Sequence, residues 1–407
     1  MTELDVIIAG AGPGGAGLAA RLAARGLAAK VLVLDRARFP RVKPCGGGLT
    51  GHAVEAMAAL GLVLDVDHTP APEAEVRFGR FARRVTLARP VNVVRREEYD
   101  ASLVAQVRAR GVEVREGEGV TGFEVAGGGV TVQTGKGSYR ARVLVGADGA
   151  GSLVRKKLRR RDRTPIRLFR GEIAAPPSWR DRRDMVYDFS LMTEGVRGYL
   201  WLFPVPGGRL NVGLMHSPGT PISGAALAGH LARGLARHGV TLDGDAVRGW
   251  PAWGYAPGAP VAAPHLLTLG DAAGIDALTG EGIAVALEHA LVAGDAIVDG
   301  LSRGDLGFGG YRRALRRATV GRELTLDRWL ARLLYGGRRW QSWLSLVLFD
   351  PDVLDLYAAR VAGGLVLADQ KLRLWRALVR HLLRLPARRQ ELVSAMTPSW
   401  TETGTAA

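Results

Sequence analysis

The chain has almost no cysteine and no long uninterrupted run of apolar residues. Its 407 residues include one cysteine, Cys45, which excludes an internal disulfide and a metal site built from several thiolates. The eight histidines, among them His216, His265 and His289, show no metal-ligand spacing. No stretch reaches the roughly 18 consecutive apolar residues of a membrane-spanning helix. We therefore expect a globular chain that holds no metal and does not cross a bilayer.

The features of a secretory signal are also missing near the N-terminus. Glu3 and Asp5 stand where a signal peptide would have a basic segment, and glycines interrupt the apolar run that follows them. The scarcity of cysteine agrees with a reducing compartment. We expect a cytoplasmic protein.

Acidic residues are scarce relative to basic ones, 39 against 55, which gives a formal net charge of +16. The excess is concentrated between residues 311 and 390, where 17 basic side chains stand against 6 acidic ones. Two explanations stay open. A genome composition that favours arginine would need no function, whereas an anionic lipid surface or an acidic electron donor would give the charge a role. We expect no nucleic-acid partner.

The first 35 residues have the pattern of a nucleotide-binding βαβ unit. An apolar run at residues 4–9 leads into a glycine-rich turn at residues 10–15, and an alanine- and leucine-rich helical stretch continues to about Arg25. A second apolar run at residues 31–34 ends at Asp35. Strand, glycines, helix, strand and acid in this order are the dinucleotide-binding fingerprint.

Each residue type in this fingerprint has a physical role. Gly10 makes the tight turn, Gly12 lets the backbone approach a pyrophosphate, and Gly15 lets the helix pack closely on the strand. Gly14 is expected at the cofactor as part of the same turn. The helix N-terminus then faces the phosphates. Asp35 is placed to accept hydrogen bonds from a ribose diol. The fingerprint alone does not choose between NAD and FAD.

Two later segments favour FAD. Residues 143–155 read VLVGADGAGSLVR, with Asp148 after an apolar strand, and residues 266–283 read LLTLGDAAGIDALTGEGI, with Asp271 after another. Both resemble the corresponding segments of the p-hydroxybenzoate-hydroxylase-like flavoproteins. The resemblance implies that Asp271 meets the ribityl chain of FAD. It also implies a helix that begins beneath the flavin ring, where backbone N–H groups offset negative charge on the reduced ring; the residues concerned are Gly280, Gly282 and Ile283.

A segment at residues 39–50, FPRVKPCGGGLT, narrows the resemblance. It is similar to the PRxKxCGG signature of the geranylgeranyl reductase family. Residues 198–204, GYLWLFP, followed by Asn-Val-Gly at residues 211–213, resemble that family's second motif, YxWxFP…NVG. Arg96, in the stretch RREEYD, matches a family arginine near the FAD. The resemblance covers roughly the first 300 residues.

Members of that family reduce isolated carbon–carbon double bonds of isoprenoid chains with hydride from the flavin. Such a bond needs a hydride on one carbon and a proton on the other, so the site must be apolar, dry and supplied with one acid. The resemblance places Cys45 by the flavin, where its thiol could donate the proton; the alternative is a small buried apolar side chain. Tyr199 and Trp201 alternate with leucines on one face of a strand, as lining for an apolar channel or as ordinary sheet core.

The remaining residues that we expect at the cofactor flank these motifs. Lys43 could pair with a phosphate or with the reduced flavin, or could be a solvated loop lysine. No second glycine fingerprint serves a nicotinamide cofactor, so NAD(P)H would bind transiently, or a reduced electron-transfer protein would be the donor. The other expected FAD contacts are Arg36, Gly46 and Gly47.

The last hundred residues have tryptophan-, leucine- and arginine-rich segments at helical spacing. In the best example, apolar residues recur from Leu372 to Leu383 beside Arg373, Arg376 and Arg380. This pattern is typical of an interfacial amphipathic helix, and equally of a helix packed on a catalytic domain. A peripheral contact with the inner membrane face is therefore one of two interpretations.

Together these patterns predict an α/β flavoprotein in three parts. The expected FAD-binding domain is discontinuous, of Rossmann type, and covers residues 1–75, 96–165 and 265–300. A mostly antiparallel substrate domain covers 76–95 and 166–264, and a helical region covers 301–407. The predicted function is reduction of double bonds in an isoprenoid or related lipid. The alternatives are a flavin monooxygenase or halogenase of the same fold, because GYLWLFP partly resembles the halogenase WxWxIP motif, and a non-catalytic flavoprotein that binds lipid or a partner.

Overall fold

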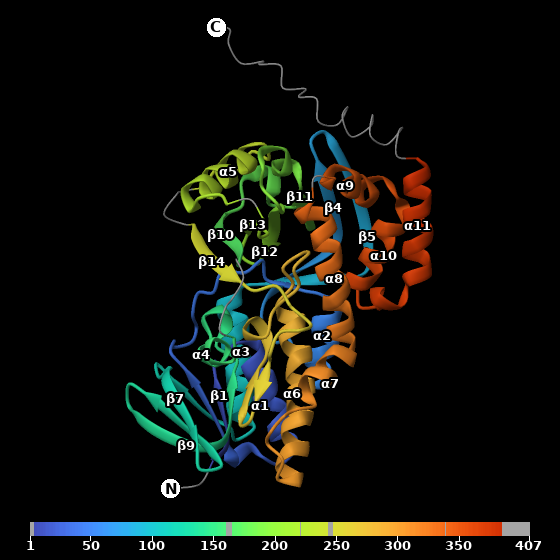
Figure 1. Ribbon diagram of the computed structural model, residues 1–407. Coiled ribbons are helices and arrows are strands. Elements are labelled where there is room, and N and C mark those ends of the chain that lie inside the picture. The colour runs from blue at the N-terminus through green and yellow to red at the C-terminus, as the bar shows by residue number, and fades with distance from the viewer. Residues whose placement is uncertain (1–3, 160–164, 220, 243–246, 338, 385–407) are drawn as a thin grey trace. The chain divides into compact units, whose positions relative to one another are not determined.

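The computed structural model describes residues 4–159, 165–219, 221–242, 247–337 and 339–384 (Figure 1). The chain divides into two compact units. The first unit comprises Met1–His68, Val94–Ile166 and Pro251–Trp329, and the second comprises Thr69–Val93, Arg167–Trp250 and Leu330–Ala407. Both units are therefore discontinuous in the sequence.

The first unit is built on a parallel sheet with strand order β16-β9-β1-β2-β6. Its central strand β1 is buried on both faces, as expected for a parallel sheet covered on both sides. A short antiparallel extension joins this sheet through β8 and β9. The strands are β1 (Leu4–Ala9), β2 (Val31–Asp35), β6 (Glu113–Glu116), β7 (Val120–Ala126), β8 (Gly129–Thr134), β9 (Gly137–Gly146), β15 (Ala262–Ala263) and β16 (Leu266–Thr268).

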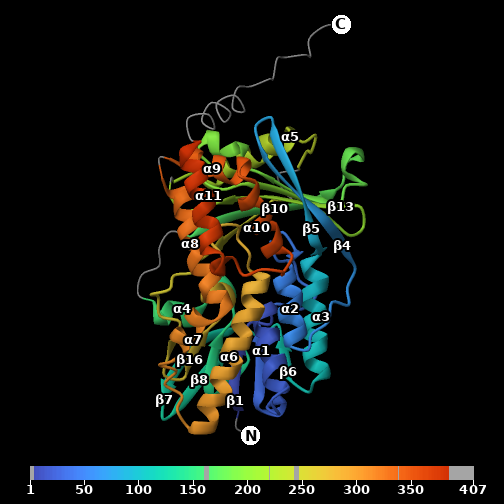
Figure 2. The same ribbon diagram turned by 90° about the vertical axis from the view of Figure 1, so that its right-hand side faces the viewer.

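Helices cover one face of this sheet. Val6 and Ile8 of β1 share a core with the helices, whereas Ile7 and Ala9 point into a second core on the side of β7 and β8. Figures 1 and 2 show α6 running alongside α1, which it contacts. The helices of this unit are α1 (Pro13–Ala23), α2 (Gly51–Ala59), α3 (Arg96–Ala109), α4 (Leu153–Leu158), α6 (Ile283–Arg303) and α7 (Tyr311–Arg317).

The second unit contains a sheet in which β14, β10, β13, β12, β11, β4 and β5 follow one another. The pairs β10–β13, β13–β12 and β12–β11 are antiparallel, and β11–β4 is parallel. Leucines of α5 pack with Leu200 and Leu202 on one face. The elements are β4 (His68–Phe78), β5 (Phe81–Val94), β10 (Ile166–Ala174), β11 (Asp184–Asp188), β12 (Leu200–Val205), β13 (Arg209–His216), β14 (Arg248–Ala252) and α5 (Gly224–Ala236).

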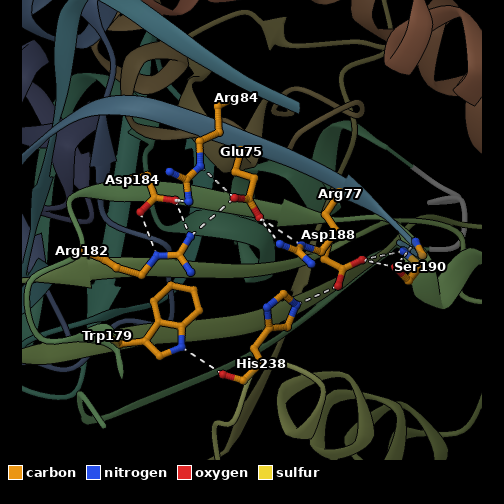
Figure 3. A network of polar contacts seen from close by, with 10 residues as sticks. Glu75, Arg77, Arg84, Trp179, Arg182, Asp184, Asp188, Ser190 and His238 are labelled. Carbon is orange, nitrogen blue, oxygen red and sulfur yellow. Dashed lines mark hydrogen bonds and ion pairs between the residues drawn. The ribbon is translucent and has the colours of Figure 1, made fainter. Parts of the chain in front are cut away.

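A polar network lies on this second sheet (Figure 3). Glu75 on β4 is almost fully buried and accepts from Arg77 at 2.7 Å and Arg84 at 3.0 Å, while Arg182 lies 3.7 Å away. Arg182 also pairs with Asp184. A buried carboxylate stays charged only where cations and hydrogen bonds compensate for its lost hydration. Three arginines do this for Glu75.

The described part of the C-terminal stretch, up to residue 384, is helical, as the sequence predicts; the part of this prediction that covers residues 385–407 lies outside the described residues. It consists of α8 (Thr319–Gly336), α9 (Trp340–Phe349), α10 (Pro351–Val361) and α11 (Lys371–Leu383). Edge-to-face aromatic contacts hold α9 on the β4–β5 hairpin: Phe78 with Trp340 and Phe81 with Phe349. The first unit extends to Trp329, within α8, and the expected start of a separate helical region at residue 301 stays a prediction. Of the helices described, none has the length and apolar composition of a membrane span.

The α/β fold with a parallel nucleotide-binding sheet, a largely antiparallel second sheet and a helical C-terminal region is therefore confirmed.

Candidate active site

The glycine-rich turn positions the N-terminus of α1. Gly10 has φ +101°, and a Cβ there would lie 2.4 Å from the carbonyl oxygen of Ala147. A Cβ on Gly15 would lie 1.8 Å from the carbonyl oxygen of Gly10, so only glycine allows this close approach. Gly12 is the N-cap of α1, and no side chain caps this end within the described residues. The first-turn N–H groups are therefore available to an anion such as a pyrophosphate.

Asp35 ties this turn to the end of β2. Its Oδ2 accepts the N–H of Ala11 and its Oδ1 accepts the N–H of Ala37, both at 2.8 Å. Each carboxylate oxygen can accept a second hydrogen bond, so a ribose diol can still be held there. Arg36 is exposed directly beside it. Gly14 packs differently: a Cβ on it would lie 2.4 Å from Leu269, so its role in the structure is close helix packing.

Asp148 has an unused acceptor. Its Oδ2 accepts the N–H of Leu153 at 3.1 Å, but its Oδ1 is buried and has no hydrogen-bond partner in the part of the chain that the structure describes. Burial raises the pKa of Asp148. A buried acceptor without a donor is costly, and a ligand hydroxyl would satisfy it.

Asp271 forms an ion pair with Lys43, Nζ to Oδ2 at 3.0 Å. Burial alone would raise the pKa of Asp271, but Lys43 lowers it below its usual value. A hydrogen bond to α6 fixes the loop that contains Asp271: the N–H of Gly270 donates to Nδ1 of His289 at 3.1 Å. Burial lowers the pKa of His289 to about 3, so this imidazole is a neutral acceptor at physiological pH.

Gly282 is the N-cap of α6, and among the described residues no side chain caps this helix start. A Cβ on Gly282 would lie 3.5 Å from Oδ1 of Asp271, so the helix start and the aspartate are neighbours. Gly280 has φ +75° in the turn before it. Ile283 begins α6 with its side chain in the core, and its backbone N–H belongs to the first turn. The flavoprotein resemblance predicts that Asp271 and the N-terminus of α6 both meet the flavin, and the structure places these two groups next to each other.

The Cys45 segment is shaped by glycine and arginine. Gly47 has φ +79°, its Cβ would lie 2.3 Å from the carbonyl oxygen of Val94, and its N–H donates to Sγ of Cys45 at 3.4 Å. Gly46 lies between Cys45 and Gly47 in the chain. Arg96 is buried and makes a double hydrogen bond to Asp100 at 2.9 and 2.8 Å. Burial would lower the pKa of Arg96, but Asp100 and its hydrogen bond to Cys45 raise it, so the guanidinium stays charged beside the thiol.

Several residues at this site were missed by the sequence reasoning. Arg41 reaches Asp100 at 3.2 Å, and Thr50 donates to Glu281 at 2.5 Å. Arg41 and Glu281 stand inside the quoted PRxKxCGG-like and TGEG segments, which could have identified them. Asp100 lies one helical turn from Arg96, at the end of the quoted RREEYD segment, so the i,i+4 spacing could have identified it. His289 gave no such signal, because its partner, the N–H of Gly270, lies 19 residues away.

Tyr199 and Trp201 belong to the second unit. Both are buried: Trp201 belongs to β12, and Tyr199, which directly precedes this strand, packs against Tyr187 and Trp201. The indole N–H of Trp201 donates to Oδ1 of Asn211 at 3.0 Å, and a Cβ on Gly213 would lie 2.1 Å from its ring. The two halves of the second motif therefore form one packed element on β12 and β13.

The structure thus brings most of the predicted residues together in the first unit, and places the two aromatic residues in the second. Those of the first unit are Gly10, Gly12, Gly14, Gly15, Asp35, Arg36, Lys43, Cys45, Gly46, Gly47, Arg96, Asp148, Asp271, Gly280, Gly282 and Ile283. Two helix ends without side-chain caps and one buried acceptor without a donor fit a dinucleotide such as FAD. Their contacts to a cofactor stay predictions.

Comparison with known proteins agrees with this site. Residues 3–182 match the FAD binding domain. The chain is 30% identical to menaquinone reductase of Mycolicibacterium smegmatis over 92% of this chain and 96% of that protein. It is 28% identical to digeranylgeranylglycerophospholipid reductase 2 of Methanopyrus kandleri, over 74% and 79% of the two chains. A geranylgeranyl bacteriochlorophyll reductase-like protein from Thermoplasma acidophilum has the same fold, with a TM-score of 0.70, 20% identity and coverage of 96% and 98%.

The glycine turn, the matched FAD-binding domain and the near-full-length similarity to menaquinone reductase define an FAD-dependent oxidoreductase. Within that class the chain belongs to the geranylgeranyl reductase family. The predicted family and FAD are confirmed, whereas the electron donor stays a prediction.

Proposed function

We propose that this enzyme reduces carbon–carbon double bonds in the isoprenoid chain of a lipid, and that a lipid quinone is the first substrate class to test. The observation that carries the proposal is the Cys45 segment, in which a thiol lies between the N–H of Gly47 and the charged guanidinium of Arg96. The near-full-length similarity to a menaquinone reductase supports the substrate class.

The helix starts at Gly12 and Gly282, with Asp148, would hold FAD, which when bound and reduced would supply the hydride for one carbon of the double bond. The chain's own residues supply the rest: Cys45 donates the proton from Sγ to the other carbon, and Arg96 and the N–H of Gly47 stabilise the sulfur once it has lost that proton. Asp100 holds Arg96 in place through the double hydrogen bond. One hydride and one proton saturate one bond.

The aromatic side chains at β12 are consistent with an apolar substrate. Tyr199 and Trp201 are large apolar surfaces held rigidly, since Asn211 fixes the indole of Trp201. We propose that they contact the isoprenoid chain and exclude water from it. The electron donor is proposed to be NAD(P)H, which would bind only transiently, or a reduced electron-transfer protein.

The test is anaerobic. The purified holoenzyme is reduced chemically, menaquinone or geranylgeranyl diphosphate is added, and flavin absorbance is followed with mass spectrometry of the lipid. We expect flavin reoxidation together with a gain of H₂ per reduced double bond that persists after the lipid is exposed to air, which returns any quinol to the quinone. Reoxidation only by oxygen, with a hydroxylated or halogenated aromatic product, would instead favour a monooxygenase or halogenase, whose fold this chain shares. Bound FAD that no substrate reoxidises would favour the non-catalytic alternative.

A further inference from the structure

Helix α11 (Lys371–Leu383) packs through only one of its faces. Ala377 and His381 are buried, and Leu374 and Leu378, which lie on the same side, are partly buried. This side contacts α9 and α10 of the same unit, beside which α11 runs in Figures 1 and 2. The helix therefore already has a packed apolar face, and its other apolar residues must be explained separately.

The opposite side of α11 has a second apolar stripe that faces solvent. Because the helix turns about 100° per residue, its members fall within roughly 100° of the circumference. The stripe, which we call the α11 stripe, consists of Leu372 (61% exposed), Trp375 (62%), Val379 (38%), Leu382 (53%) and Leu383 (79%). Single exposed apolar residues need no explanation, but a continuous row of five on one helix face marks an interaction surface.

Basic residues border the α11 stripe. By the same helical geometry, Arg373, Arg376, Arg380 and Arg384 occupy the adjoining roughly 80°, and Lys371 lies on the other border. Arg380 pairs with Asp350, the N-cap of α10, and with Asp352 in its first turn, whereas Arg373, Arg376 and Arg384 are exposed. The sequence of α11 contains no acidic residue. A partner for this side must therefore be apolar in its interior and anionic at its surface.

We propose that the α11 stripe docks this protein on an anionic lipid bilayer. Trp375 and the aliphatic side chains enter the boundary between headgroups and acyl chains, and the arginines along one border meet lipid phosphates. A tryptophan at headgroup depth beside basic residues is the pattern of an interfacial helix, and the net charge of +16 adds long-range attraction. The proposal concerns binding alone and does not depend on the reaction proposed above.

The experiment is co-sedimentation of the full-length holoenzyme with vesicles, either of phosphatidylcholine alone or of phosphatidylcholine mixed with phosphatidylglycerol. We expect binding to the anionic vesicles that weakens at high salt, and little binding to the neutral ones. The double substitution Trp375→Ser and Leu382→Ser should lower partitioning about tenfold or more. Arg373→Ser with Arg376→Ser should lower it about fivefold for each arginine on anionic vesicles.

A matched control removes two arginines of the first unit, Arg313 and Arg317 on α7, both replaced by serine. This variant changes the net charge equally and should keep most of the binding. Equal losses in the control and the α11 variant would overturn the proposal, because net charge alone would then explain binding. Unchanged binding of the Trp375→Ser, Leu382→Ser variant would overturn it too. Flavin content and thermal unfolding of each variant show that the fold is intact.

A second copy of the chain is the competing occupant of the α11 stripe. In sedimentation velocity without lipid, a dimer that Leu382→Ser converts to a monomer would overturn the proposal in favour of a homodimer interface. An unchanged sedimentation coefficient together with lost vesicle binding supports it. Since both measurements are independent of turnover, failure to reduce an isoprenoid would leave this proposal standing.

Discussion

Cys45 and Arg96 lie together in the first unit, and we propose that they supply the proton of the reaction. Gly47 must be glycine because its φ is positive and Val94 leaves no room for a Cβ, and this fold of the backbone directs an N–H at the sulfur. Arg96 is held by Asp100 on the same helix, one turn further along α3. The thiol, the cation and the backbone donor are therefore fixed relative to one another before any ligand binds.

If Cys45 supplies the proton, its replacement should affect chemistry and not cofactor binding. We expect Cys45→Ala to retain FAD and to reduce the double bond at least about tenfold more slowly, a modest share of a general acid's usual contribution. The measurement is the rate of anaerobic flavin reoxidation by the lipid in a single turnover. Cys45→Ser keeps a weaker acid at the same place, so its rate should lie between those of the unmodified protein and Cys45→Ala. An unchanged rate in both variants would remove Cys45 from the mechanism.

The ion pair between Lys43 and Asp271 should contribute to FAD affinity. Since the pKa of Asp271 is lowered, this carboxylate is charged at neutral pH, and Asp271→Asn leaves the half-buried ammonium of Lys43 without its charged partner. We expect FAD to bind about 10- to 100-fold more weakly, the usual value of a hydrogen bond between charged groups. Quenching of flavin fluorescence on titration measures this affinity.

The matched control is Asp295→Asn, which removes an exposed aspartate that pairs with Arg21 in the same unit. Surface ion pairs contribute little, so this variant should bind FAD as the unmodified protein does. A loss of affinity as large as that of Asp271→Asn would mean that net charge, and not the specific pair, sets the affinity.

At the scale of elements, the pairing of β12 with β13 explains why the second motif has two halves. Trp201 lies opposite Gly213, and Phe203 lies opposite Asn211, in an antiparallel register. The indole therefore covers the glycine and reaches the amide of Asn211. Val212, between them, points to the other face and joins the leucine core under α5. Because side chains alternate along a strand, Asn211 and Gly213 contact Trp201 on one face, and Val212 joins the apolar core on the other.

Gly213→Ala should destabilise the second sheet. The new Cβ would lie 2.1 Å from the Trp201 ring and 2.3 Å from the backbone oxygen of Phe169, which cannot move without shifting β10. We expect a loss of about 1–3 kcal/mol in the free energy of unfolding. Urea denaturation followed by tryptophan fluorescence measures it. Gly249→Ala, where the nearest atom of Phe169 is 3.4 Å away, is the control and should change stability by less than about 1 kcal/mol.

The sequence predicted the elements of the flavin site well, and its contacts only in part. The turn at residues 10–15 and the start of α6 could be predicted because glycine at fixed spacing dictates local backbone geometry. The ion pair of Lys43 with Asp271, 228 residues apart, could not be derived in that way, nor could the hydrogen bond of Thr50 to Glu281, 231 residues apart. Those contacts depend on how α2 and α6 pack, which brings the segments before the two helices together and which local pattern does not encode.

For the whole molecule, buried carboxylates predict sensitivity to acid. Burial would raise the pKa values of Glu75, Asp184 and Asp188, but arginines lower the first two, and His238 with Ser190 lowers the third (Figure 3). The unfolded chain therefore takes up protons at a higher pH than the folded one. The stability that these groups contribute is present above the ordinary carboxyl pKa of about 4 and is lost as the pH falls further.

We expect the free energy of unfolding to fall steeply below about pH 4. Urea unfolding at a series of pH values measures it. Glu75→Gln should lower stability at neutral pH and flatten the dependence, because that carboxylate no longer titrates. Glu124→Gln, at an exposed site on β7, is the control and should leave the curve unchanged. A Glu75→Gln curve parallel to that of the unmodified protein would show that the network does not govern acid unfolding.

The sequence by itself determined a nucleotide-binding βαβ unit with a parallel first sheet, since its glycines, strand-end acid and helix start act through neighbouring backbone atoms. The choice of FAD over NAD came from the resemblance of residues 143–155 and 266–283 to flavoprotein segments. Tertiary structure decided the rest. Arg96 meets Cys45 only because α3 packs against the Cys45 segment, and Gly213 meets Trp201 only through the strand register. The sequence did not predict which side of α11 is buried, because this helix has apolar residues on both sides. Packing buried Ala377 and left Trp375 in solvent, since only one side of a helix can face its neighbours.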